Sequence, residues 1–527
     1  MKNVFKRLLS LLLALSFICI ALIACGNNAN NGENKSSENA TNSANATQQM
    51  ETNAYGEPSF TSSITYDNLD FEGETITILG RGYLSNTREW YKEHPEDELD
   101  EAIAMRNEAV SEALNVDVQF EWIPSNGQDY NEFVNTFFQV VTQDVVSGMH
   151  YYDISASYAY PTASSTIRDY TTNLKDKDLF PYFDFSLPCW NQAIVTNTTF
   201  NEQLFYVAGD INLSMFDAAM VVWHNKTLFD ENREATDPEN MQELALEGYW
   251  TYDELYRWTS VFYEDSNGTA GRQEDDTYAL MASNVQPCPI DAFPYAWDLE
   301  FVIENNDQTH SFNIVGNDRA ERALTKFRNL ANGTGTSTSW SAKVFAAGHA
   351  MFYMERIFHN YDSNMAIREM EDKYGLLPMP KFDAEQEQYA TTAQDYYNLM
   401  FVLDHAESSV PTKGEAISAY LQLATEESYT GVRGYYFNRI IKPKFFGTDD
   451  SEGTVTNSIA LFDIIVSNIK FDYCYIYSMQ LSNINHLWRD AGRKNAGSLE
   501  SFFLSKQSSF ENAIAQTDEW LGLRTLD

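Results

Sequence analysis

Cysteine is scarce in this chain of 527 residues, which contains five, and no two of them have the CxxC spacing of zinc or redox sites. Neither an HExxH pair nor a GxSxG turn occurs, so these signatures of zinc proteases and serine hydrolases are absent. No sequence unit of about 20–50 residues repeats, which argues against a solenoid. Beyond the N-terminal region, no apolar run approaches the roughly 20 residues of a membrane-spanning helix.

Basic residues are also few. The chain has 35 Lys and Arg against 76 Asp and Glu, a formal net charge of −41. Nucleic-acid binding depends on Lys and Arg that neutralise phosphates, so a nucleic-acid partner is excluded. The same long-range field repels anionic lipid surfaces and strongly anionic ligands. Solubility alone explains the charge equally well, and on either interpretation we expect a neutral or cationic ligand.

The one long apolar run lies at the N-terminus. Lys2, Lys6 and Arg7 precede an almost entirely apolar stretch over residues 8–22, an order typical of a secretory signal. The sequence LIAC that ends at Cys25 resembles the lipobox of bacterial lipoproteins. That resemblance implies cleavage before Cys25 and acylation of this residue. The alternative is an ordinary signal peptide, or an uncleaved anchor, that happens to contain a cysteine.

We therefore interpret residues 1–25 as a lipoprotein signal peptide and residues 26–60 as a disordered tether rich in Asn and Ser. Two or more acyl chains would hold the protein stably to a membrane, with the rest of the chain outside it. Residues 61–527 exceed one comfortable core, because chains usually divide into domains beyond about 250–300 residues. This length predicts two lobes.

The first half of the folded region alternates between strand and helix patterns. Apolar residues alternate over 74–80, and residues 97–115 carry an apolar stripe at helical spacing. A second strand, a second helix and a third strand are predicted at 116–122, 131–148 and 151–158. This order is typical of a parallel sheet covered by helices.

A second cycle follows. We expect strands at 204–211, 219–225, 346–354, 374–382 and 396–404, helices at 251–265 and 318–333, and mostly helices from 412 to the end.

Several stretches together resemble one family. EDELDEAIAMRN is followed by LNVDVQFEW, and later come VVWHNKTLFDE, LEGYWTYDELYRWT and FAAGHAMFYM. In order and spacing they are similar to the extracellular solute-binding proteins of ABC-type importers, in the carbohydrate-type branch (family 1). The resemblance covers nearly all of residues 74 to about 450. One departure is Cys189, where the family often has the first Trp of a Pro-Trp-Trp-Asn sequence.

The resemblance implies an α/β, two-lobed periplasmic-binding-protein-like fold (type II), with a hinge between the lobes and a helix-rich C-terminal part. It places lobe 1 mainly in 70–205 plus parts of 395–527, and lobe 2 mainly in 206–390. It also implies capture of an oligosaccharide-like ligand and delivery to the membrane subunits of an ABC importer. The protein would sit on the outer face of the bacterial cytoplasmic membrane, held only by its lipid anchor. Neither a cofactor nor a metal is implied.

Candidate ligand residues follow from where open α/β sheets hold ligands, which is beyond the carboxyl ends of their strands. Carboxylate, amide and guanidinium groups bond sugar hydroxyls, while Tyr and Trp cover the C–H faces of the sugar. The candidates at strand ends or in loops are Arg81, Tyr158, Tyr160, Trp190, Asp210, Asn212, Trp297, Trp340, Arg356, Tyr396 and Tyr397.

Two sets of alternatives stay open for these residues. We expect at least two of Trp190, Tyr158, Trp297 and Tyr396 to face the cleft, although any single Trp is otherwise a core residue. For Arg356, ligand contact and a structural ion pair are both consistent with the sequence.

Other functions and pairings also stay open. A lipid-anchored glycan-degrading enzyme would use a similar aromatic cleft, and abundant acids hide any catalytic carboxylate pair. A ligand sensor for a membrane kinase would have the same sequence features. GRGYLS after the first strand lacks the third Gly of a nucleotide-binding loop. Cys189, Cys288 and Cys474 are interpreted as buried thiols, with one disulfide as the alternative.

Overall fold

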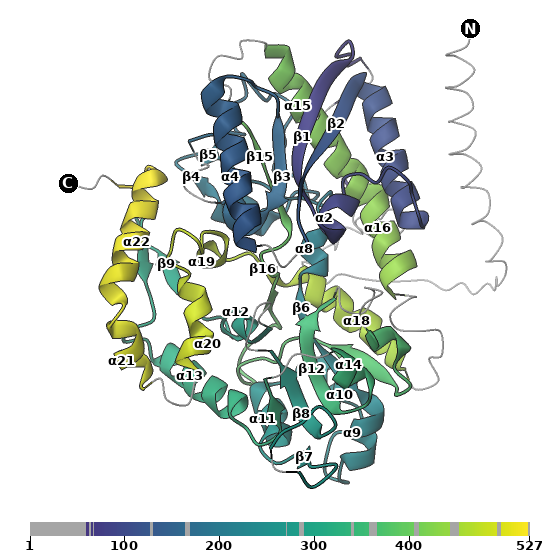
Figure 1. Cartoon of the computed structure of the whole chain (residues 1–527), viewed down its shortest axis with the longest axis vertical. Helices are drawn as coiled ribbons and strands as arrows, with labels where there is room; N and C mark the ends of the chain where they lie inside the picture. Colours follow the sequence, from purple (N-terminus) through teal and green to yellow (C-terminus); the bar gives the residue numbers. More distant parts are fainter. Residues whose placement is uncertain are drawn as a thin grey trace, which may run out of the picture. The chain divides into compact units, whose positions relative to one another are not determined.

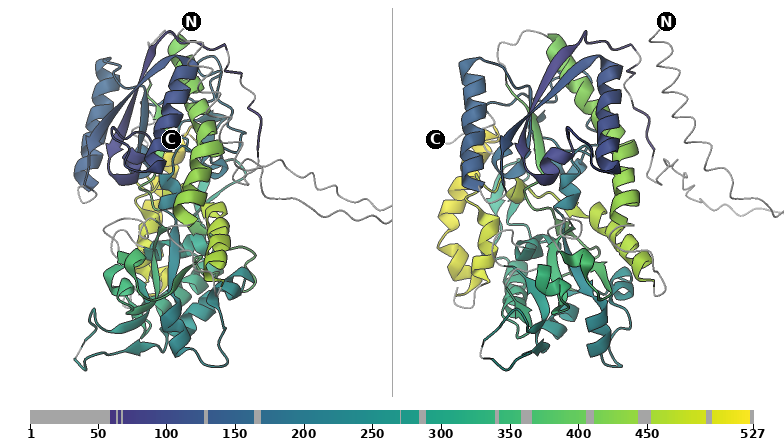
Figure 2. Two further views of the ribbon diagram at one scale, coloured as in Figure 1. Left: turned by 90° about the vertical axis from the view of Figure 1, so that its right-hand side faces the viewer. Right: turned by 45° about the vertical axis from the view of Figure 1, so that its right-hand side comes forward.

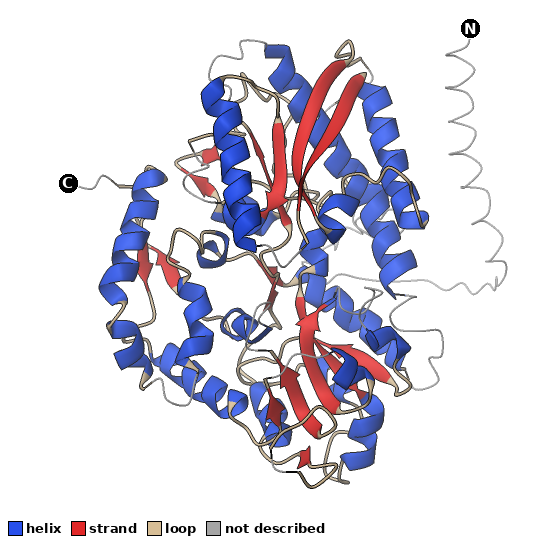
Figure 3. Ribbon diagram, in the orientation of Figure 1, coloured by secondary structure: helices blue, strands red, loops and turns tan. Residues whose placement is uncertain are grey.

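A computed structural model describes the following residues: 59–62, 65–66, 68–126, 130–163, 169–269, 271–283, 289–338, 342–357, 366–404, 411–442, 453–492 and 497–524. The signal peptide, Cys25 and nearly all of the tether lie outside them, as do Cys288 and Trp340. Figure 1 shows the described elements along the chain, and Figure 3 distinguishes the helices from the strands.

The first sheet has the strand order β15-β3-β1-β2 (Figure 1). Its strands are β1 (Glu74–Gly82), β2 (Val116–Pro124), β3 (Ile154–Tyr158) and β15 (Asn398–Val402). β1 runs parallel to both β2 and β3, whereas β15 joins β3 antiparallel. Helices α3 (Glu98–Leu114) and α4 (Tyr130–Ser147) connect the parallel strands. The predicted strand–helix–strand–helix–strand order is confirmed.

Apolar periodicity explains why these elements pack as they do. In β1, Ile76 and Ile78 are fully buried. The stripe of α3 that includes Leu99 and Ile103 is buried too, and α3 also packs against α15 (Pro411–Glu427). Figure 2 shows α15 running alongside the first sheet from a distant part of the sequence. The first lobe therefore needs a C-terminal segment to complete its core.

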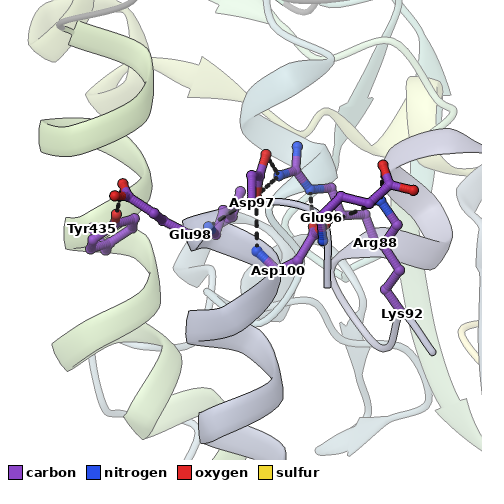
Figure 4. A network of polar contacts seen from close by, with 8 residues as sticks. Arg88, Lys92, Glu96, Asp97, Glu98, Asp100 and Tyr435 are labelled. Carbon is purple, nitrogen blue, oxygen red and sulfur yellow. Dashed lines mark hydrogen bonds and ion pairs between the residues drawn. The ribbon is translucent and has the colours of Figure 1, made fainter. Parts of the chain in front are cut away.

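A polar network fixes the start of α3 (Figure 4). Asp97 caps the helix by accepting backbone N–H bonds from its first turn. Arg88 lies 2.5 Å from Asp97 and 2.7 Å from Asp100, and Lys92 lies 3.1 Å from Asp100. Burial alone would raise the pKa of Asp100, but the Glu96 N–H, Arg88 and Lys92 together hold it below its usual value. The network places the loop after β1 against α3.

The second sheet has the order β11-β8-β12-β6-β13, with β7 pairing to β8. β12 is parallel to β8 and antiparallel to β6, so this sheet is mixed. Its strands are β6 (Met220–Asn225), β7 (Tyr263–Glu264), β8 (Thr277–Ala282), β11 (Thr336–Ser337), β12 (Ala350–Arg356) and β13 (Tyr374–Leu377).

The chain crosses between the sheets several times, and the crossing segments lie side by side. Residue pairs Val207–Met400 and Ala219–Ala393 form isolated bridges between the first and second crossings. β14 (Thr391–Thr392) pairs in parallel with β16 (Ile469–Lys470) of a third segment. We call residues 207–219, 391–398 and 468–473 the junction.

The remaining helices cover the sheets and fill the C-terminal part. They are α2 (Leu84–Arg88), α5 (Ala159–Thr162), α7 (Gln192–Asn197), α8 (Ser214–Asp217), α9 (Lys226–Asn232), α10 (Met241–Leu246), α11 (Tyr252–Thr259), α12 (Phe293–Ala296), α13 (Asp318–Ala331), α14 (Ala342–Ala346), α16 (Arg433–Tyr435), α18 (Thr454–Ser467), α19 (Tyr473–Ile476), α20 (Leu487–Ala491), α21 (Leu499–Leu504) and α22 (Gln507–Trp520). Among the helices in the described ranges, none combines the length and the apolar character of a membrane span.

Three expected elements differ from the prediction. The strand predicted at 204–211 is reduced to β5 (Gln203–Leu204), which pairs with β4 (Thr199–Phe200), and the chain then turns through the junction. The helix predicted at 251–265 ends at Thr259, because the chain turns to pair as β7 with β8. The strand predicted at 374–382 ends at Leu377, since Pro378 cannot donate a ladder hydrogen bond.

Two cysteines of the described part, Cys189 and Cys474, are free and buried, as expected for packing thiols.

Candidate ligand-binding site

The carboxyl ends of β1 and β3 bring Arg81 and Tyr158 together, as their positions at neighbouring parallel strands predict. The guanidinium carbon of Arg81 lies 4.8 Å from the centroid of the Tyr158 ring. The rings of Tyr83 and Phe133 lie 4.8 and 5.0 Å from the same carbon. Arg81 Nε also donates to Ser125 Oγ at 3.1 Å. Cation–π contacts with three rings thus hold the guanidinium at the sheet edge.

Asp395, from the second crossing, faces this pair. The Tyr158 hydroxyl donates to Asp395 Oδ1 at 3.1 Å. Burial raises the pKa of Asp395 to about 6, while the Tyr158 bond and the charges of Arg81 and Arg489 act against that rise. The carboxyl group therefore changes its charge close to neutral pH, which is common for side chains at functional sites.

Tyr160 extends the cluster towards the C-terminal part. Its hydroxyl donates to Asn483 Oδ1 at 2.6 Å, and its ring stacks on His486 with centroids 6.3 Å apart. Burial and the nearby charge of Arg489 lower the pKa of His486 to about 4. The imidazole is thus neutral at physiological pH. It offers a flat face and a ring nitrogen instead of a charge.

Arg489 links the cluster to a short 3-10 helix that packs beside β12. Its Nε and Nη2 bond the two carboxylate oxygens of Asp291 at 3.2 and 2.5 Å. Asp291 belongs to a short 3-10 helix, Pro289–Ala292, whereas Arg489 lies on α20. A bidentate pair of this kind is rigid and directional. It holds the C-terminal helices beside the second lobe at the edge of the site.

Arg356 and Tyr396 contribute from the second sheet and the second crossing. The guanidinium carbon of Arg356 lies 5.3 Å from the Tyr396 ring centroid, and its Nη1 donates to Gln394 Oε1 at 2.7 Å. Nε donates to Glu355 Oε1 at 2.9 Å, so the ion pair that the sequence left open does form. Tyr83 interacts electrostatically with Arg356 and connects this group to Arg81.

The cluster is almost closed to solvent. Exposed fractions are 4% for Arg81, 6% for Tyr158, 8% for Tyr160 and 7% for Asp395. Its members come from β1, β3, β12, the second crossing and the segment around α20, so both lobes contribute. This arrangement can present hydroxyl, carboxylate, amide and guanidinium groups beside flat rings. Together they match the rim and the faces of a sugar.

Other predicted residues lie elsewhere. Trp190 is 1% exposed, packs edge-on against Phe183 and donates from Nε1 to Gln422 Oε1 at 3.0 Å. Trp297 is fully buried, and its Nε1 donates to the Pro380 carbonyl at 3.1 Å. Both rings are packed in the core, and contact of either with a ligand stays a prediction.

The remaining candidates have structural partners. Asp210 pairs with Arg433 at 3.1 Å. Asn212 accepts the Gly209 N–H at 3.1 Å. The Tyr397 ring packs edge-on against Phe471. Trp340 lies outside the described residues.

Sequence reasoning missed Asp395, Asp291, Arg489 and His486. Asp395 directly precedes two predicted tyrosines, and this adjacency could have identified it. Arg489 and His486 lie in a C-terminal helical region whose position in space has no local signal in the sequence. Only the packing of that region beside β3 and the second lobe brings these side chains to the cluster.

No protein-family model matches this chain, and no curated protein matches it in sequence. Solved structures do match. The cyclic α-maltosyl-1,6-maltose binding protein of Arthrobacter globiformis is 11% identical, with a TM-score of 0.51, over 84% of this chain and 100% of that one.

A second match is the galacto-N-biose-/lacto-N-biose I-binding protein of the ABC transporter from Bifidobacterium longum. It is 11% identical over 85% of this chain and 98% of that one, with a TM-score of 0.49. A third match is an ABC substrate-binding protein from Listeria monocytogenes in complex with cycloalternan. It is 13% identical over 86% of this chain and 100% of that one, with a TM-score of 0.46. At such low sequence identities, a structural match shows a shared fold and nothing more. The match to the Arthrobacter protein therefore shows that this chain has the α/β, two-lobed periplasmic-binding-protein-like fold.

Proposed function

We propose that this protein is an extracellular, lipid-anchored solute-binding receptor. It captures an oligosaccharide-like ligand between its two lobes and delivers it to an ABC importer. One observation carries the proposal: a cluster of rings and hydrogen-bonding groups, supplied by both lobes, lies at the carboxyl ends of parallel strands in a binding-protein fold. The structural neighbour from Arthrobacter globiformis is named as a binding protein for a cyclic maltose derivative.

The chemistry of the cluster suits a neutral, hydroxyl-rich ligand. Asp395 and the guanidinium groups of Arg81 and Arg356 bond hydroxyls around the sugar ring, while Tyr160 and Tyr396 cover its C–H faces. The net charge of −41 disfavours a strongly anionic ligand. We therefore place uncharged oligosaccharides first among the ligands.

Ligand entry requires movement of the lobes. Arg81, Tyr158, Tyr160 and Asp395 are each less than a tenth exposed, so a ligand would reach them only if the lobes moved apart. In the proposed cycle, the junction segments act as a hinge, and a ligand that touches both lobes stabilises the closed form over the open one.

The N-terminal sequence supports the anchoring part of the proposal. Cys25 follows LIA after a positively charged and then apolar segment, and the tether separates it from the folded lobes. Acylation would keep the receptor at the outer face of the cytoplasmic membrane, next to the importer's membrane subunits. Cys25→Ala should release the protein or stall its processing. Normal processing with complete membrane retention would count against lipidation.

Binding is tested with a panel of neutral oligosaccharides, by calorimetry and small-angle scattering. We expect at least one binder to reduce the radius of gyration, because closure compacts the molecule. Tyr160→Ala should weaken that binder about tenfold to a hundredfold, by analogy with loss of a buried side-chain face worth ~1–3 kcal/mol. Tyr249→Ala, an exposed tyrosine on another surface, is the matched control.

Three results would contradict the proposal. Binders that leave the radius unchanged would exclude the closing mechanism. Unchanged affinity in folded Tyr160→Ala protein would exclude this cluster as the site. Cleavage of the oligosaccharides with turnover would show that the protein is an enzyme and not a receptor.

A further inference from the structure

A separate pocket of about 320 Å³ lies beside the junction. Its walls come from residues 193–200, residues 295–310 with β9 (Val302–Glu304), and residues 469–473 with β16. None of the residues of the candidate ligand site lines it. We call it the junction pocket. Its volume is at the lower end of the ~300–1,000 Å³ that small-molecule sites occupy, so it suits a small ligand.

Buried aromatic rings form part of its lining: Phe200, Tyr295, Phe471 and Tyr473. Tyr473 stacks face to face on His310, with ring centroids 3.9 Å apart. Phe200 stands edge-on to both rings, at 5.8 Å from His310 and 6.0 Å from Tyr473. His310 Nδ1 is in turn bonded to Asp518 at 2.7 Å. The aromatic wall is therefore held in place before any ligand arrives.

Carboxylates gather around these rings. Glu300 and Glu304 are exposed at the rim, and Asp472 lies deeper, half-buried. Within the described residues, no ion pair involves any of these three acids. Lys470, the lysine of the pocket lining, is already bonded to Asp298. The pocket thus has negative charge that its own cation does not balance.

The surroundings of Asp472 also have more negative than positive charge. Burial and then the charge of Glu300 raise the pKa of Asp472 to about 7. The N–H groups of Cys474 and Tyr475 and the charge of Lys470 oppose this rise without cancelling it. A cation placed beside Asp472 and Glu300 would relieve the repulsion between the two carboxylates.

We propose that the junction pocket binds a small organic ammonium ion. Aromatic faces attract a cation through their π electrons, and carboxylates add charge-assisted contacts. Phe200 and Tyr473 supply the faces, and Asp472 with Glu300 supplies the charge. The apolar wall favours an alkylated ammonium over a hydrated metal ion. This site is independent of the oligosaccharide site, and its test needs no sugar.

The probe is choline, compared with its uncharged isostere 3,3-dimethyl-1-butanol, by calorimetry on the folded protein. We expect choline to bind and the isostere to bind at least about tenfold more weakly, because only the charge differs. Asp472→Asn should weaken choline by about tenfold or more. It preserves the helix cap, in which the Asp472 side chain accepts the Tyr475 N–H, since Asn caps equally well.

Two further variants separate the contributions. Phe200→Leu keeps an apolar side chain but removes the ring face, and it should also weaken choline. Glu264→Gln, an exposed acid on β7, is the matched control and should leave choline binding unchanged. If Phe200→Leu does not fold, as judged by its melting curve, Asp472→Asn alone decides.

The pH dependence gives an independent readout. With a pKa of about 7, Asp472 is roughly one-tenth ionised at pH 6 and nine-tenths at pH 8, so choline affinity should rise about tenfold. Asp472→Asn should remove most of this rise. The proposal is overturned if choline does not bind at ~20 mM, if the isostere binds equally, or if folded Asp472→Asn protein binds choline like the wild type.

Discussion

Replacement of Asp395 by Asn should stabilise the protein at alkaline pH while it weakens ligand binding. Asp395 lies in the candidate site with its side chain bonded to the Tyr158 hydroxyl at 3.1 Å. Burial raises its pKa from 3.8 to about 6, although Tyr158, Arg81 and Arg489 all favour the charged form. The native state therefore destabilises this carboxylate relative to the unfolded chain, despite its partners.

The magnitude follows from linkage. Between pH 3.8 and about 6 the native state binds more protons than the unfolded state, so stability falls as pH rises through this window. A rise of this size corresponds to roughly 3 kcal/mol, at 1.36 kcal/mol per pKa unit. Asn has nearly the same shape, accepts the same hydroxyl bond and carries no charge. The variant should thus be more stable than the wild type by up to about 3 kcal/mol at pH 8, and nearly equal to it at pH 4.

Urea unfolding, followed by tryptophan fluorescence at pH 4 and pH 8, measures the difference. The control is Asp253→Asn, whose carboxylate is 71% exposed and pairs with Lys326 at 3.1 Å. A surface pair of this kind contributes ~0–1 kcal/mol and should show no such trend with pH. The reasoning is refuted if Asp395→Asn is less stable than the wild type at pH 8, or if the difference between them is the same at both pH values.

Two further predictions concern the scaffold. Asp100→Asn should lower the free energy of unfolding by about 1–3 kcal/mol at pH 7, because the buried carboxylate bonds Arg88 at 2.7 Å. The control is Glu96→Gln. The Glu96 side chain is 76% exposed in the same network, and its replacement should lower the free energy of unfolding by less than about 0.5 kcal/mol. Since folding lowers the pKa of Asp100, its carboxylate stabilises the native state above the pKa of the unfolded chain, and this stabilisation is lost as pH falls through the pKa of the folded state. Urea midpoints at several pH values measure the loss. A difference between the variant and the wild type that does not change with pH would contradict the prediction. Trp297→Ala should cost about 3–5 kcal/mol, and Trp190→Phe about 1 kcal/mol for its lost bond to Gln422. Weakened ligand binding at unchanged stability in either variant would show that the core interpretation is wrong.

The sequence by itself determined the elements whose signal is local. Alternation in β1 and the stripe of α3 predict these elements because side-chain periodicity follows directly from strand and helix geometry. The same argument placed Arg81 and Tyr158 at one sheet edge, since neighbouring parallel strands end together. The resemblance to solute-binding proteins indicated the two-lobed fold that the structural comparison shows.

The tertiary structure alone decided features that depend on distant partners. The segment 204–211 has the apolar character of a strand, but Cys189 and Thr425 leave no room for a side chain at Gly209, and beyond β5 only single bridges form, from Val207 to Met400 and from Gly209 to Trp190. Trp190 and Trp297 look like ligand aromatics in sequence, yet contacts with Gln422 and Pro380 bury them. Asp395 and Arg489 join the candidate site only through tertiary packing, which brings the second crossing and the C-terminal region beside β3. Local patterns do not encode such contacts, because burial and charge pairing arise from chain segments far apart in sequence.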